Sequence, residues 1–127
     1  MKLLLDTHAF LWFAAGDRRL GRGARQAMEH AEAELHISVA SIWELAIKSS
    51  LGRLTLPAPI DQYAAEKIEE GYRMQAVDWS HAAAVERLAA IHRDPFARLI
   101  AVQALAEKMT LVTRDKVFRR YGVQTIW

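Results

Sequence analysis

The 127-residue sequence contains no cysteine, which excludes disulfide bonds and thiolate metal sites. A metal site in this chain must therefore use aspartate, glutamate or histidine, and a carboxylate cluster suits Mg²⁺ or Mn²⁺. No run approaches the ~18 uncharged apolar residues of a membrane span. The apolar start meets an acid at Asp6, too early for a signal peptide. We therefore expect a cytoplasmic protein.

The chain also lacks a phosphate-binding glycine loop. Its glycines fit neither the P-loop nor the dinucleotide-binding pattern, and no internal repeat or low-complexity segment interrupts the sequence. The hydrophobic content of 52% is enough to build a core in a chain of this length. We expect one domain over residues 1–127.

Arginine is much more frequent than lysine in this sequence, and several arginines are clustered. The formal net charge is only +2, yet 12 of the 17 basic residues are arginines. One group comprises Arg18, Arg19, Arg22 and Arg25, and a second comprises Arg114, Lys116, Arg119 and Arg120. Such clusters can grip phosphates bidentately, although solvated helix faces explain any single residue equally well.

Short apolar runs alternate with helical patterns along the chain. Strands are expected at residues 2–5, 35–39, 74–77, 109–113 and 123–127. Helices are expected at residues 7–15, 22–34, 41–48, 60–70 and 80–91, the last capped by Ser80, and a further helix from Asp94. This alternation predicts an α/β fold with three layers, in which helices cover both faces of a mainly parallel sheet.

Carboxylates fall where several of these elements meet. Asp6 and Asp115 follow strands, Glu44 lies early in the helix after the second strand, and Asp94 opens the helix before Pro95. Ligands in open parallel sheets bind beyond the carboxyl ends of the strands. These acids are therefore expected at one edge of the sheet.

Each acid also has an ordinary structural explanation. Asp6, Asp94 and Asp115 can cap the helices that follow them. Ser41 and Glu44 have the spacing of a capping box. Capping does not require the acids to crowd together, however, and a bound divalent cation relieves the repulsion that crowding causes. Two further polar side chains, His8 and His92, lie near the same edge, and a structural role is the simpler interpretation of both.

Taken together, the sequence resembles the PIN-domain family, and within it the VapC-type toxins of bacterial toxin–antitoxin pairs. The resemblance spans the chain and rests on the segments LLLDTH (residues 3–8), SVASIWELAIK (38–48), LGRL (51–54), HRDPF (92–96), AVQA (101–104), LVTRD (111–115) and YGVQTIW (121–127). Each segment is weak alone, but their order and spacing are specific.

The resemblance implies a PIN fold and a Mg²⁺- or Mn²⁺-dependent ribonuclease that cleaves RNA. It further implies a cognate VapB-like antitoxin that covers the site, and a homodimer. Asp6, Glu44 and Asp115 match the family's metal-binding and catalytic acids, with Thr113 as a nearby polar residue. We expect an apolar antitoxin tail to lie near Trp12, Trp43 and Leu54 and to point a basic side chain at the acids.

One metal-binding position departs from the family pattern. Members typically read Asp-Pro-Phe-Asp-Arg where this chain has Ala97 between Phe96 and Arg98. Asp94 cannot be assumed to replace the missing acid, because a capping carboxylate is directed at its own helix. We expect Ala97 to face solvent and to leave the enzyme inactive or impaired. Alanine at position 97 can have two origins. A natural loss of the aspartate would leave a non-catalytic RNA- or partner-binding module, whereas an introduced Asp-to-Ala change would silence a toxin. The intact flanking motif favours the second origin.

Overall fold

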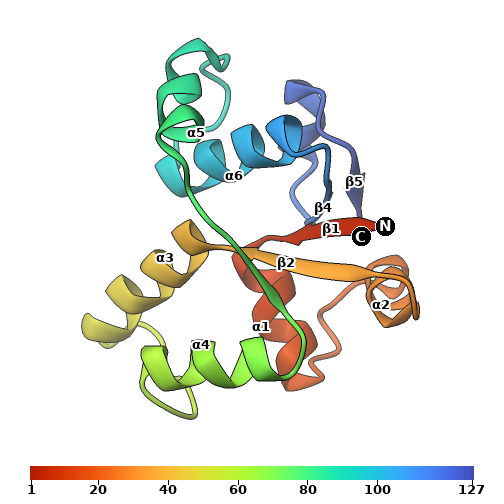
Figure 1. Cartoon of the computed structure of the whole chain (residues 1–127), viewed down its shortest axis with the longest axis vertical. Coiled ribbons are helices and arrows are strands. Elements are labelled where there is room, and N and C mark those ends of the chain that lie inside the picture. Colours follow the sequence, from red (N-terminus) through yellow and green to blue (C-terminus); the bar gives the residue numbers. More distant parts are fainter.

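The protein is built on a five-stranded sheet whose strands are all parallel. The computed structural model describes residues 1–127 (Figure 1). The spatial order is β3-β2-β1-β4-β5. The strands are β1 (Lys2–Leu5), β2 (Glu34–Ser38), β3 (Arg73–Gln75), β4 (Thr110–Val112) and β5 (Thr125–Ile126). The expected parallel sheet is thus confirmed, with β1 at its centre.

Helices connect the strands and cover both faces of the sheet. They are α1 (Thr7–Ala15), α2 (Arg22–Glu29), α3 (Val39–Ser50), α4 (Ile60–Glu69), α5 (Trp79–Ala84) and α6 (Pro95–Ala106), with 3-10 helices η1 (Val85–Arg87) and η2 (Lys116–Tyr121). In Figure 1, α1 and α6 lie on opposite sides of the sheet. None of these helices combines the length and the apolarity needed to cross a membrane.

The two-residue period of β1 divides the core into two layers. Leu3 and Leu5 pack with Phe10 of α1 on one face, while Leu4 packs with Ile100 of α6 on the other. All five side chains are at least 97% buried. This alternation produces the three-layer α/β/α architecture that the sequence predicts.

Two predicted helices end earlier than expected. The second stops at Glu29, because Glu34 already pairs with Lys2 in the sheet. The fifth begins after Asp78 rather than Ser80 and gives way to η1 before residue 91. The Arg98 guanidinium explains that ending, since it donates hydrogen bonds to the carbonyls of residues 85, 88 and 89. A long-range side-chain contact thus replaces the helical hydrogen bonds.

His36 on β2 makes the stability of the fold sensitive to acid. The residue is 92% buried, and its Nε2 atom has no hydrogen-bond partner. Burial lowers the pKa of His36, and the nearby Glu34 carboxylate only partly opposes this. In the unfolded chain a histidine titrates near 6.5, so below that pH the unfolded state binds more protons than the folded state.

We therefore expect the free energy of unfolding to fall as the pH drops through about 6.5, and replacing His36 by leucine to reduce this loss. Urea unfolding at about pH 7.5 and about pH 5.5 measures the difference. Replacing the exposed His30 by glutamine is the matched control. An unchanged pH dependence in the His36→Leu variant would contradict this assignment.

Candidate metal centre

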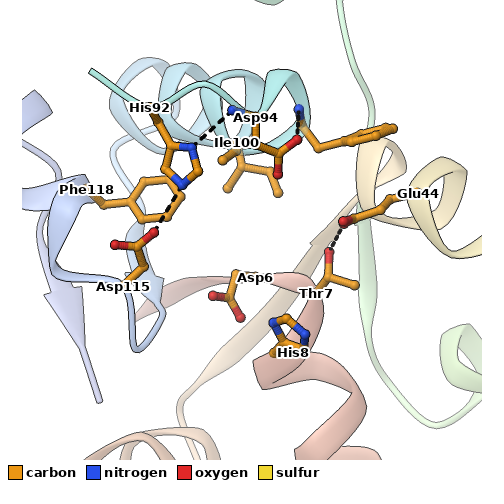
Figure 2. Close-up of a pocket in the computed structure, with 11 residues that line it drawn as sticks. Asp6, Thr7, His8, Glu44, His92, Asp94, Ile100, Asp115 and Phe118 are labelled. Atoms are coloured by element: carbon orange, nitrogen blue, oxygen red, sulfur yellow. Dashed lines mark hydrogen bonds and ion pairs between the residues drawn. The ribbon is translucent and has the colours of Figure 1, made fainter. Parts of the chain in front are cut away.

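Carboxylates from four elements meet in a hollow of about 200 Å³ beyond the carboxyl end of the sheet (Figure 2). The lining residues are Asp6, Thr7, His8, Glu44, His92, Asp94, Phe96, Ala97, Ile100, Asp115 and Phe118. The structure therefore brings together Asp6, Glu44, Asp94, Ala97 and Asp115, the residues that the sequence singled out. Thr113 lies behind the hollow, buried in the sheet edge.

Asp6 is the most enclosed acid of the group. It ends β1 and caps α1, where its Oδ1 accepts a hydrogen bond of 2.8 Å from the amide of Ala9. Burial raises the pKa of Asp6 above its ordinary value, and hydrogen bonds from Thr113 and Ala9 oppose this rise. The Asp115 carboxylate adds to the rise, since a second negative charge disfavours ionisation. A cation in the hollow would relieve both effects.

Thr113 links the two acids. Its Oγ1 accepts a hydrogen bond from the amide of Asp115 at 3.1 Å, and the hydroxyl is hydrogen-bonded to Asp6. A hydroxyl has one donor and two acceptor positions, so a single threonine can serve both neighbours. Thr113 is 97% buried and lines no part of the hollow, which makes it a positioning residue.

His92 orients the second acid. Its Nδ1 accepts a hydrogen bond from the amide of Asp94, so the neutral ring carries its proton on Nε2. That Nε2 lies 3.1 Å from Oδ2 of Asp115, whose other oxygen caps η2 through the amide of Val117. His92 thus lines the hollow and contacts one of its acids, Asp115.

Glu44 approaches from α3 on the far side of the hollow (Figure 2). Thr7 donates a hydrogen bond of 2.6 Å to its Oε1, and the Lys48 ammonium lies 2.9 Å from its Oε2. The expected capping box is wrong, because α3 begins one turn earlier with Ser38 as its cap. Ser41 is consequently buried within the helix and its hydroxyl has no partner.

The start of α6 places two residues at the hollow, the capping Asp94 and Ala97 in the first turn. Asp94 caps α6 as predicted, accepting a hydrogen bond from the amide of Phe96. Ala97 does not face solvent, contrary to expectation: it is 8% exposed and packs in the second core layer with Leu4 and Ile100. The solvent-facing prediction failed because α6 turns this edge toward the sheet. Ala97 therefore lines the hollow with a methyl group, whereas the other elements contribute carboxylate oxygen atoms.

The donor chemistry of the hollow suits a hard divalent cation, but the ligand atoms of Asp6, Glu44 and Asp115 do not lie within 4.8 Å of one another. Each of Asp6, Glu44 and Asp115 reaches the hollow as a carboxylate, and a carboxylate oxygen that accepts one hydrogen bond keeps a further lone pair. Oxygen donors of this kind are those that Mg²⁺ prefers, with waters completing its coordination. The hollow contains no sulfur ligand. Position 97 contributes no donor.

A second group of ligand-type side chains lies elsewhere, where α5 meets the end of α6. Ligand atoms of Asp78, His81 and Glu107 lie within 4.8 Å of one another. The Nδ1 of His81 accepts a hydrogen bond from the amide of Asp78, which leaves the proton on Nε2, 3.0 Å from Glu107. The proton thus occupies the position a metal ion would need, and we interpret this group as a clamp between helices.

Sequence reasoning missed the apolar wall of the hollow and Thr7. Thr7 directly follows Asp6, so its position one residue into the same turn was the available signal. Phe96, Ile100 and Phe118 carry no sequence signal that separates them from other core residues. Their role follows only from packing.

The chain is an α/β/α domain with an open parallel sheet, and its carboxylates lie where such folds bind their ligands. A model of the "PIN domain" family matches residues 3–124, and the chain belongs to the PIN domain family.

Similar proteins agree with this placement. The chain is 34% identical to Ribonuclease VapC22 of Mycobacterium tuberculosis over 120 residues, which cover 94% of this chain and 91% of that protein. Its fold is similar to VapBC2 from Rickettsia felis, with a TM-score of 0.72, 17% identity and full coverage of both chains. VapBC-1 from nontypeable Haemophilus influenzae gives a TM-score of 0.67 at 19% identity, covering 98% of this chain and 96% of that one. The predicted family resemblance and fold class are confirmed.

Proposed function

We propose that this protein is the toxin of a toxin–antitoxin pair, a ribonuclease that hydrolyses RNA phosphodiester bonds with Mg²⁺ or Mn²⁺. The observation that carries this proposal is the convergence of Asp6, Glu44 and Asp115 on one hollow, beside the position where Ala97 stands. The similarity to Ribonuclease VapC22 supports the substrate class. We place this activity in the cytoplasm, as one domain over residues 1–127.

In this proposal Asp6 and Asp115 hold the cation most directly, and Glu44 on α3 adds a third negative charge to the hollow. When bound, a divalent cation supplies Lewis acidity and lowers the pKa of water for attack at phosphorus. The chain's own residues prepare the hollow. Thr113 fixes the spacing of the two aspartates, His92 orients Asp115, and Lys48 balances the charge of Glu44.

We propose that Ala97 leaves this chain inactive or strongly impaired. The methyl group borders the hollow and offers no lone pair to a cation. The test is RNA cleavage by the Ala97→Asp variant with and without Mg²⁺, with the unmodified chain as the matched control. A folded variant that cuts no RNA would overturn the ribonuclease proposal.

A non-catalytic RNA- or partner-binding module is the second candidate, and Ala97 is the observation that favours it. In that case Asp6, Asp94 and Asp115 serve only as the caps that they visibly are. The same cleavage experiment decides between the two, because a restored carboxylate activates only a domain that is otherwise complete.

We propose two protein partners. A cognate antitoxin would lay an apolar segment in a groove of about 460 Å³ that contains Leu11 and Leu54 and shares Thr7 and His8 with the metal centre. Trp12 also lines that groove and is 8% exposed. A second copy of the chain would cover the exposed apolar stripe along α3 and its C-cap, which comprises Val39, Trp43, Ile47 and Leu51.

A further inference from the structure

Five arginines that the sequence divides between two groups form one surface in the folded chain. Trp12 joins them: the guanidinium of Arg19 lies 4.9 Å from the centre of its ring, and that of Arg114 lies 5.2 Å from it. Arg114 therefore lies beside Trp12, whereas the other basic residues of its sequence group lie on η2. The contacts around one tryptophan therefore connect the two groups.

This surface begins at the metal centre. A second, smaller hollow is lined by Asp6, His8, Trp12, Arg114, Asp115 and Trp127, so it shares both aspartates with the first. Arg114 is exposed and directly precedes Asp115. A chain of phosphates leaving the acids in this direction would meet Arg114 first.

From Trp12 the surface continues onto the loop before α2. An open depression there is lined by Gly16, Arg18, Arg19, Leu20, Gly21, Arg22 and Arg25. Trp127 holds this loop close to Trp12, with their ring centres 5.8 Å apart. A Cβ added to Gly21 would lie 2.6 Å from Cδ1 of Trp127, so only glycine permits this approach. The arginines of the loop are thus fixed beside the second hollow.

The surface keeps an excess of positive charge. Asp17 binds Arg19 through two hydrogen bonds to its Nε and one of 2.7 Å to its Nη2, and it holds that guanidinium over Trp12. Arg25 lies 3.6 Å from Glu29. Arg18, Arg22 and Arg114 are exposed and make no ion pair. Three unpaired guanidiniums along one path favour a polyanion, because each can grip a phosphate with two parallel N–H groups.

We propose that this arginine path, Arg114, Arg19, Arg18 and Arg22, carries the sugar–phosphate backbone of single-stranded RNA away from the metal centre. The inference rests on the proposed ribonuclease function and adds the direction in which the substrate runs. The path contacts phosphates and reads no bases, so it contributes affinity for any sequence. It borders the groove beside Leu54 at Trp12 and Arg19, which line that groove as well.

The test uses the unmodified chain, whose Ala97 allows binding to be measured without cleavage. Fluorescence anisotropy gives the affinity for a labelled oligouridine of about 12 nucleotides, within the site sizes of proteins that bind single strands. Removing two charges in the Arg18→Gln/Arg22→Gln variant is expected to weaken binding about tenfold at low salt, and to lower the slope of log K against log salt by about 1.4. The same double substitution should weaken the binding of an oligoadenosine by the same factor.

The matched control removes two charges elsewhere. Arg87→Gln/Lys108→Gln changes exposed residues outside the path and should leave the affinity and the salt slope unchanged. A labelled trinucleotide, too short to reach Arg18, should bind both double variants alike. Equal RNA binding by the two double variants would overturn the path.

Cleavage separates this inference from the proposed function. In an Ala97→Asp background, Arg18→Gln/Arg22→Gln should raise the KM for long RNA and leave kcat nearly unchanged, because these residues lie away from the acids. Mg²⁺-dependent cleavage with an unaltered KM would overturn the path while leaving the ribonuclease intact. No cleavage by the Ala97→Asp chain itself would overturn the ribonuclease proposal and leave the binding measurements to decide the path.

Discussion

Replacing Ala97 by aspartate is expected to raise Mg²⁺-dependent RNA cleavage on the order of 10³-fold over the unmodified chain. The methyl group borders the hollow between the other carboxylates, so a side chain one carboxyl group longer places oxygen donors there. Stabilisation of the transition state by a metal amounts to several kcal/mol, and each 1.4 kcal/mol, roughly, is a factor of ten in rate. Purified variant and parent are compared on one RNA, with Mg²⁺ and with excess chelator.

The buried position of Ala97 makes a second readout informative. An aspartate placed there adds a charge beside the Asp6 and Asp115 carboxylates, so the metal-free variant should be less stable than the parent. Mg²⁺ should recover that stability, because a ligand that binds only the folded state stabilises it. Ala97→Asn, similar in size but uncharged, is the matched control. A folded Ala97→Asp variant that neither gains stability with Mg²⁺ nor cuts RNA would contradict the assignment of position 97.

Replacing Asp6 by asparagine in the restored chain is expected to lower cleavage by about 10³-fold again, because it removes the most enclosed carboxylate of the hollow. Burial raises the pKa of Asp6, so its ionised form destabilises the metal-free fold at neutral pH. The sign follows from proton linkage: where the pKa of a carboxyl is raised by folding, the folded protein loses stability as the pH rises from the unfolded pKa to the folded one. The metal-free Asp6→Asn variant should therefore be no less stable than its parent.

That combination separates chemistry from folding. Urea unfolding without metal measures stability, and cleavage rates with Mg²⁺ measure function. Replacing the exposed Asp61 by asparagine removes a carboxylate from the first turn of α4 and should change neither quantity. Full activity in the Asp6→Asn variant would show that Asp6 is only the cap of α1.

The sequence predicts the sheet well because its signals are local. Three consecutive leucines form the buried part of β1, and α1 begins after Asp6 and ends at Gly16, whose φ of +65° suits glycine. Where the prediction failed, a distant contact decides the structure. Arg98 terminates the segment after α5 through three carbonyl groups, and no pattern within that segment announces this contact.

The candidate metal centre shows the same division. Strand-end acids could be placed at one edge from chain order and the geometry of parallel sheets, and Asp6 and Asp115 do meet there. The sequence could not show that Thr113 joins them or that Ala97 is buried, since both depend on how α6 and β4 pack. Capping and convergence are also compatible, because Asp6 and Asp115 each serve as a cap within the hollow.

Anomalous diffraction from Mn²⁺-soaked crystals of the Ala97→Asp variant tests the central claim most directly. Mn²⁺ takes the oxygen ligands that Mg²⁺ takes and can be located by its own scattering. We predict a peak between the carboxylates of Asp6, Asp115 and position 97, and a much weaker one in the unmodified chain. A peak at Asp78, His81 and Glu107 instead, or none at either place, would contradict the account.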